Sequence, residues 1–354
     1  MVESRVVVFG SGDFALGGVL GEIRGDISIH VFTRTPQSIR SKAVVPVLQK
    51  NLEYCLAFAG TPRERVAVTS VQAYDSKEGM AELRKLLMSE KTVGLACSVG
   101  VGQISVIQAI ETALTGNETS IEAPLFILPC ENEPENSHWQ ELHSSGSLDR
   151  QTLVLPTMVD RICNHLRVED DAVVVNVEKY RELLVEFSGP ARGVESSIAS
   201  SKILLKSLSI ELSADIEKDR TRKILLMNGL QMGLAAFAYK ERKSSTTEYF
   251  EEVSDAMNVF VQLSEEIALG VSYMLDIPVP EAMEWATKYR NRILLAPDTI
   301  ERLLRRVFDY EPAQALATVH KRGGALISLL REKLGNESRL IESNAILRDI
   351  IENR

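Results

Sequence analysis

The sequence predicts an α/β domain of the Rossmann type followed by an all-α domain. In the first half, short runs of Val, Ile and Leu alternate with stretches of helical periodicity, which is typical of βαβ units in a mostly parallel sheet. In the second half, apolar residues recur at helical spacing, without strand-like runs of comparable quality. The character changes near Gly189 and Pro190. We therefore expect a Rossmann-type domain over residues 1–190 and an all-helical domain over residues 191–354.

Each predicted strand of the first domain is an aliphatic or β-branched run bounded by polar or helical sequence. Parallel strands need such near-continuous apolar runs, because helices cover both faces of the sheet. The predicted strands cover residues 6–9, 27–32, 66–71, 93–98, 125–128, 152–155 and 173–177. A glycine-rich turn and a helical stretch to about residue 24 follow the first of them.

The second domain contains helical segments, several of which start close to a proline. A helix tolerates proline in its first turn, and Pro278, Pro280, Pro297 and Pro312 stand at or before such starts. The predicted segments cover residues 193–217, 219–243, 246–275, 279–291, 298–309, 311–335 and 338–352.

Composition and charge argue against several classes of function. The 354 residues carry a net charge of −9, which is a poor basis for binding nucleic acid or an anionic membrane. The four cysteines lie too far apart for a zinc site or a dense disulfide framework. The N-terminus lacks the pattern of a signal peptide, and no apolar run has transmembrane length. We therefore expect a cytoplasmic monomer or homodimer that binds a small-molecule substrate and no metal.

The glycine-rich turn has the pattern GxGxxA directly between the first strand and a helix. The first glycine permits a tight turn, the second lets the backbone approach a pyrophosphate, and the small residue keeps helix and strand close. The helix N-terminus offers free N–H groups to the phosphates. The alternative is a βα turn without a ligand. The residues expected to contact the cofactor are Gly10, Ser11, Gly12, Asp13, Phe14 and Ala15.

The end of the second predicted strand indicates which dinucleotide binds. Proteins that select NAD usually place an acidic residue there to accept a hydrogen bond from the ribose 2′-OH. This chain has Thr33, Arg34 and Thr35 instead, and the Arg34 guanidinium can bind a 2′-phosphate. We therefore favour NADP, with NAD as second choice. The alternative is that Arg34 is a solvated charge at a strand end.

Small residues follow the strand predicted at 93–98. They would let the nicotinamide and its ribose lie against the backbone at the switch point of a doubly wound sheet. We expect Ser98 and Val99 to contribute to this part of the cofactor site. Cys97 has no surrounding pattern of a nucleophile, so we interpret it as a small packed residue.

A polar set interrupts the apolar helical run near residue 223. Lys223, Asn228 and Gln231 fit one broad face at about 100° per residue. Burying a lysine and two amides is costly without partners, so one interpretation is a functional site that supplies such partners. The alternative, equally compatible with the pattern, is an amphipathic helix whose lysine reaches solvent and whose amides contact neighbouring loops.

The glycine-rich turn and the Lys223 pattern occur in the same order, together with three further blocks, in a known family. The sequence resembles the polyol-specific long-chain dehydrogenases, the family of mannitol dehydrogenase and mannitol-1-phosphate 5-dehydrogenase. That family carries K-x4-N-x2-H on a helix of its all-α second domain, and Lys223 and Asn228 match its first two positions. The resemblance extends over residues 5–240 and implies an all-α C-terminal domain with the architecture found in 6-phosphogluconate dehydrogenase. The other matching blocks are residues 9–14, 130–132, 157–162 and 175–178.

The resemblance implies an NAD(P)-dependent dehydrogenase or reductase acting on CH–OH groups. A hydride would pass between nicotinamide and a secondary alcohol or ketone of a sugar alcohol, sugar phosphate or related polyhydroxy substrate. Lys223 would be the acid/base, with Asn132 and Asn228 holding the reacting oxygen. Asp160 would bind substrate hydroxyls or orient neighbouring groups, whereas its neighbour Arg161 would form a structural ion pair at the domain junction.

The chain departs from the family pattern at Gln231, where the family has histidine. Glutamine can hydrogen-bond a substrate hydroxyl and would bind substrate here, but it cannot relay a proton. Two alternatives stay open: a 2-oxo acid or imine reductase of the ketopantoate or opine type, and a cofactor-binding protein that has lost activity. Basic segments at residues 289–292, 302–306 and 320–324 would suit an anionic substrate if they faced the site, and otherwise form solvated helical faces.

Overall fold

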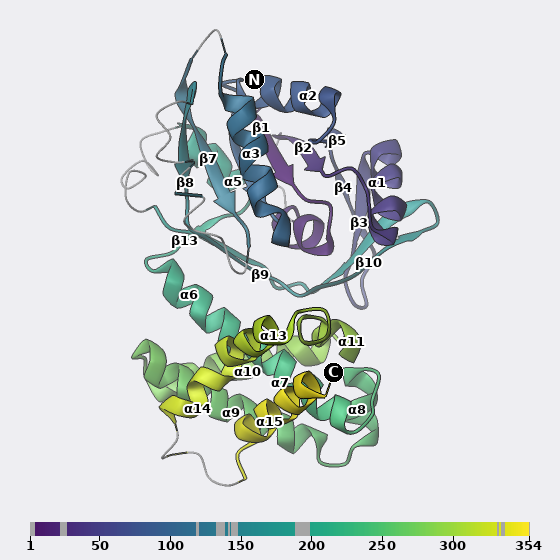
Figure 1. The fold of residues 1–354 in the computed structure, drawn as a ribbon, viewed down its shortest axis with the longest axis vertical. Helices are drawn as coiled ribbons and strands as arrows, with labels where there is room; N and C mark the ends of the chain where they lie inside the picture. Colours follow the sequence, from purple (N-terminus) through teal and green to yellow (C-terminus); the bar gives the residue numbers. More distant parts are fainter. Residues whose placement is uncertain are drawn as a thin grey trace. The chain divides into compact units, whose positions relative to one another are not determined.

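The computed structural model describes residues 4–21, 27–117, 120–131, 139–140, 142, 148–187, 199–330, 333 and 337–353. The chain falls into two units, Met1–Ile216 and Glu217–Arg354, and each is described by itself (Figure 1). Within the described residues, no helix is both long and apolar enough to cross a membrane.

A six-stranded parallel sheet forms the centre of the first unit, which confirms the predicted fold class. The chain enters at β1 in the middle, continues outward to β2 and β5, and returns to the other side of β1 for β6, β7 and β8. This order, β5-β2-β1-β6-β7-β8, puts the switch point between β1 and β6. The strands are β1 (Ser4–Phe9), β2 (Ile27–Thr33), β5 (Ser70–Ala73), β6 (Thr92–Cys97), β7 (Ile121–Pro129) and β8 (Arg150–Val154).

Side chains of the central strand alternate between two hydrophobic clusters, as the two-residue period of a strand requires. Val6 and Val8 pack with residues of α1 (Ile39–Asn51), whereas Val7 and Phe9 pack on the other face with α2 (Lys77–Leu87) and α3 (Gln103–Leu114). Because both faces are covered, the strand is apolar at every buried position. This explains why the sequence pattern identified it.

Among the described residues of the first unit, two smaller sheets accompany the parallel one. One has the order β10-β11-β3-β4 and the other β13-β12-β9. The predicted strand at 66–71 is wrong as a single element, because its two ends belong to β4 and β5 in different sheets. The strands are β3 (Glu53–Ala57), β4 (Glu64–Ala67), β9 (Thr157–Asp160), β10 (Cys163–Glu169), β11 (Ala172–Val177), β12 (Glu182–Val185) and β13 (Glu211–Leu212).

Residues 199–216 belong to the first unit, although the sequence pattern placed the boundary at residue 190. Leu204 of α5 (Ala199–Ser207) contacts Gly94 of β6, and Leu208 lies in the same cluster. The helix predicted at 193–217 is interrupted, because β13 pairs with β12 after α5 ends.

Helices make up the second unit wherever the structure describes it, as the sequence predicted. Pro280 lies in the first turn of α10 and Pro312 is the first residue of α13. The long helices α9 and α10 pack against each other, and α15 packs against α7 and α9. The α-helices are α6 (Ile216–Lys223), α7 (Leu230–Lys240), α8 (Thr246–Glu252), α9 (Ala256–Leu275), α10 (Val279–Leu295), α11 (Ile300–Leu303), α12 (Arg305–Phe308), α13 (Pro312–Val319), α14 (Ala325–Leu329) and α15 (Arg339–Glu352).

Candidate functional site

The glycine-rich turn follows β1 at the switch point of the sheet. Gly10 has φ +120°, and a Cβ built there would lie 2.2 Å from the carbonyl oxygen of Ser98, so this position requires glycine. A Cβ at Gly12 would meet nothing within 4 Å. The backbone at Gly12 is therefore open to a ligand, as a pyrophosphate-binding turn needs.

A helix follows this turn, as expected, and it is π-helical. It is η1 (Phe14–Val19), and Asp13 caps it by accepting a hydrogen bond from Phe14 N at 3.0 Å. Ala15 is buried and Phe14 half-buried. Arg40 forms an ion pair with Asp13 at 3.3 Å, so its guanidinium lies beside the turn.

Polar contacts fix the segment after β2. Thr33 Oγ1 lies 3.2 Å from Ser11 Oγ and donates to the Arg34 carbonyl oxygen at 3.2 Å. Thr35 donates its N–H and its hydroxyl to the same oxygen of Asp75, at 2.9 and 2.8 Å. Both threonine hydroxyls thus have protein acceptors, whereas the Arg34 side chain is exposed. Sequence reasoning missed Asp75, whose only signal is its position just beyond β5, the neighbour of β2.

The segment after β6 lies beside the glycine-rich turn. Ser98 N donates to Phe9 O at 2.9 Å, and Ser98 and Val99 are half-buried. Glu131, directly after Cys130, accepts hydrogen bonds from the N–H groups of Val99 and Gly100. Sequence reasoning did not assign a role to Glu131. Burial raises the pKa of the Cys97 thiol well above its usual value, which agrees with a packed residue.

Asp160 and Arg161 lie at the end of β9, and both are buried. Arg161 donates to the carbonyl oxygens of Glu178 and Gly17 at 3.0 and 3.1 Å, and its guanidinium lies over the Phe58 ring. These contacts tie η1 to the strands around it. They favour a structural role for Arg161.

The Lys223 set lies on one continuous helical stretch of the second unit. Lys223 ends α6 and is only 4% exposed, Asn228 lies in the π-helical turn η4 (Ile224–Gly229), and Gln231 is in the first turn of α7. In an α-helix, residues five apart point about 140° from each other. The i→i+5 bonding of a π turn aligns such residues more closely. The turn therefore brings Lys223 and Asn228 nearer to one face than the sequence predicted. Asn132, the third predicted catalytic residue, lies outside the described residues.

The basic segments of the last third mostly have local partners. Arg290 donates to Ser264 Oγ at 2.8 Å, and Arg292 is buried over the Tyr289 ring. Arg302 pairs with Asp298, and Arg305 with Asp309. Such pairing favours structural roles for these arginines over an anion site.

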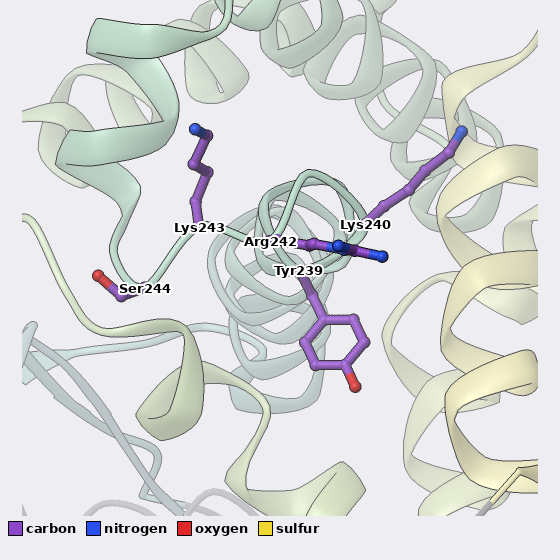
Figure 2. Close-up of a pocket in the computed structure, with 5 residues that line it drawn as sticks. All are labelled: Tyr239, Lys240, Arg242, Lys243 and Ser244. Atoms are coloured by element: carbon purple, nitrogen blue, oxygen red, sulfur yellow. The ribbon is translucent and has the colours of Figure 1, made fainter.

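A separate pocket of about 510 Å³ lies at the C-terminal end of α7, away from the end that carries Gln231 (Figure 2). Its lysines diverge in Figure 2, and each has a carboxylate partner: Lys240 with Glu342 and Lys243 with Glu252. The cations therefore do not converge on one point. In the part of the chain that the structure describes, no cluster of His, Cys, Asp and Glu could hold a metal ion.

Comparison with known proteins gives relatives for this arrangement. The family model of the mannitol dehydrogenase Rossmann domain matches residues 4–193. A D-sorbitol dehydrogenase in substrate-free form aligns with a TM-score of 0.65 at 12% identity, over 99% of this chain and 81% of that one. The Pseudomonas fluorescens mannitol 2-dehydrogenase, in a ternary complex with NAD and D-mannitol, aligns with a TM-score of 0.63 at 15% identity, over 98% and 79% of the chains.

A third structure differs in the ligand of its complex. A D-mandelate dehydrogenase in a ternary complex with NADH and anilino(oxo)acetate aligns with a TM-score of 0.56 at 11% identity, over 99% of this chain and 98% of that one. At these identities the structural matches show a shared fold. No match was found among curated protein sequences.

Proposed function

The chain belongs to the mannitol dehydrogenase family, and from this membership we propose that it is a nicotinamide-dependent oxidoreductase acting on a polyhydroxy substrate. The observation that carries the proposal is the turn at Gly10–Ala15, placed at the switch point with open space above Gly12. These residues fit a dinucleotide, because a small-residue turn and a helix N-terminus can approach a pyrophosphate. When bound, the nicotinamide supplies the hydride acceptor or donor.

NADP is the proposed cofactor, with NAD as the second choice. The exposed Arg34 at the end of β2 supports NADP, because its guanidinium can pair with a 2′-phosphate. Ser11, Thr33 and Thr35 shape this end of the site through the contacts described above. Ser98 and Val99 would lie against the nicotinamide half.

Lys223 is the proposed acid/base that exchanges the proton of the substrate hydroxyl. A buried amine followed by an amide five residues on, across a π turn, suits this role, because amide N–H groups stabilise an oxygen that gains negative charge. We propose Asn228 and Asn132 as these donors, and Asp160 and Gln231 as contacts to substrate hydroxyls. The substrate class is a sugar alcohol, a sugar phosphate or a related polyhydroxy compound.

Replacing Lys223 tests the assignment directly. General acid/base catalysis contributes about 100-fold to 10,000-fold in rate, so Lys223→Met should lower kcat by at least about 100-fold. Binding of NADPH or NADH should change little, because the cofactor turn lies on the first unit. Steady-state turnover with a panel of hexitols and sugar phosphates, followed at the nicotinamide absorbance, measures the effect. Lys218→Met, on the same helix, is the matched control.

A second candidate function is a 2-oxo acid or imine reductase. It is favoured by Gln231, which stands where the family has a histidine that could exchange a proton with the lysine. A panel of 2-oxo acids with NADPH or NADH tests a reductase of that kind. Turnover of a 2-oxo acid and of no polyol would replace the proposed substrate class. Tight cofactor binding without turnover of either panel would instead indicate a binding protein without catalysis.

A further inference from the structure

Glu131 joins the ends of two neighbouring strands at the switch-point side of the sheet. It follows β7, and its Oε1 accepts hydrogen bonds from the N–H groups of Val99 and Gly100, the second at 2.9 Å. The main chain supports the same junction, because Cys130 N donates to Cys97 O at 2.8 Å. The side chain therefore fixes the start of the β6–α3 connection.

The backbone that Glu131 holds includes a residue with left-handed φ. Gly100 has φ +62°, in the left-handed region, and lies between the end of β6 and the helix α3. Two successive N–H groups directed at one point form a concavity that favours an anionic acceptor. The Glu131 carboxylate supplies that acceptor from within the protein, and hydrogen bonds to an ionised group are stronger than neutral ones.

Residues 98–100, whose backbone Glu131 holds, also contact the glycine-rich turn. A Cβ at Gly10 would come within 2.2 Å of Ser98 O, so the two backbones touch. A shift of residues 98–100 would thus change the surface beside the glycine-rich turn. In an open α/β sheet, ligands bind beyond the carboxyl ends of the strands at this point.

We propose that Glu131 is a positioning residue for the nicotinamide half of the dinucleotide. Its carboxylate fixes the backbone of residues 98–100, and this backbone forms the surface against which the nicotinamide riboside binds. The adenosine half contacts other segments, around Arg34 and Thr35, and does not depend on Glu131. The inference rests on the proposed function, because it presupposes a nicotinamide dinucleotide at the site.

Comparing whole and truncated nucleotides tests this role in the full-length protein. NADPH and NADH are titrated by fluorescence, and 2′-phospho-ADP-ribose and ADP-ribose, which lack nicotinamide, by calorimetry. Glu131→Ala should weaken the preferred dinucleotide by about tenfold or more, while the affinity for its nicotinamide-free counterpart changes by less than about twofold. Glu131→Gln should recover most of the affinity, because its amide oxygen can accept both hydrogen bonds.

Two further variants keep the test decisive. Gly100→Ala strains the same segment without a clash, since nothing lies within 4 Å of its Cβ, and it should reproduce the selective loss even if Glu131→Ala does not fold. Asp149→Ala is the matched control. Asp149 accepts a hydrogen bond from Asn117 N at 2.7 Å just before β8, at the amino ends of the parallel strands and opposite to the ends that carry Glu131 and the glycine-rich turn, so dinucleotide affinity should be unchanged.

The outcomes separate this inference from the proposed function. Equal losses for whole and truncated nucleotides, or unchanged binding in both the Glu131 and Gly100 variants, would overturn the positioning role while the dehydrogenase assignment stands. A wild-type protein that binds neither NADPH nor NADH would overturn the proposed function itself, and the inference with it.

Discussion

Replacing Arg34 by alanine tests the proposed preference for NADP. The guanidinium is exposed at the end of β2, where the 2′-position of the adenosine ribose is expected. A hydrogen bond to a charged group contributes about 1.5–3 kcal/mol. Loss of this contact should therefore weaken NADPH binding by about tenfold to 150-fold. NADH has no 2′-phosphate, so its affinity should change by less than about twofold.

The substitution should leave the surrounding structure in place. The Thr33 hydroxyl uses the backbone carbonyl of Arg34, which alanine keeps, and Thr35 is held by Asp75. Thermal unfolding of Arg34→Ala should match the wild type. Arg65→Ala is the matched control, because Arg65 is an exposed arginine on β4, in the sheet that lacks the cofactor turn, where it pairs with Glu53.

Fluorescence titration with NADPH and NADH gives both affinities on one preparation. The reasoning fails if Arg34→Ala leaves NADPH binding unchanged, or if both cofactors weaken by the same factor. It also fails if the wild-type protein prefers NADH. In that case the carboxylate of Asp75, close to Thr35, becomes the group to replace next.

Two further predictions follow from packing. Gly10→Ala should lower stability by about 2 kcal/mol or more, because φ +120° and the contact with Ser98 O exclude a side chain, and the melting temperature should fall by about 4–8 °C. Gly12→Ala should leave the melting temperature unchanged and weaken dinucleotide binding, so equal effects of the two variants on stability would contradict this view of the turn. Of the four cysteines, only Cys55 is not buried, so a thiol reagent should modify one thiol rapidly in the native protein and all four after unfolding. Rapid modification of more than one thiol would show that the packing around Cys97, Cys130 or Cys163 opens in the native protein.

The sequence predicted the central sheet well because its physics is local. Strands covered on both faces are continuous apolar runs, as in Val6–Phe9. Some strands of the two smaller sheets lack such an apolar run. β10 contains His165 and Arg167, and β13 has two exposed residues, so neither pattern stands out. The run at 66–71 keeps β-branched residues on both sides of the point where the chain passes from one sheet to another, so its pattern does not show that two strands meet there.

The sequence predicted those site residues that lie together in one segment of the chain. It did not predict the residues whose role depends on hydrogen bonds to a distant segment. The glycine-rich turn and the Lys223 set are contiguous, so their residue types indicate their chemistry. Asp75 and Glu131 act through hydrogen bonds to Thr35 and Gly100, which are distant in sequence. The π turn η4 was also missed, because an analysis at 100° per residue assumes a regular α-helix.

The π-helical turn between α6 and α7 makes the length of this segment a constraint in its own right. Such a turn corresponds to one extra residue within an α-helix. Deleting one residue between Lys223 and Gln231 would remove this extra residue and leave a regular helix, with Leu230 and Leu234 still in their buried positions. The turn also packs closely on its surroundings, because a Cβ at Gly229 would meet the Arg322 carbonyl oxygen. A single inserted residue, harmless in most loops, would turn α7 by about 100° and so displace the residues Met232–Ala238, which are all buried.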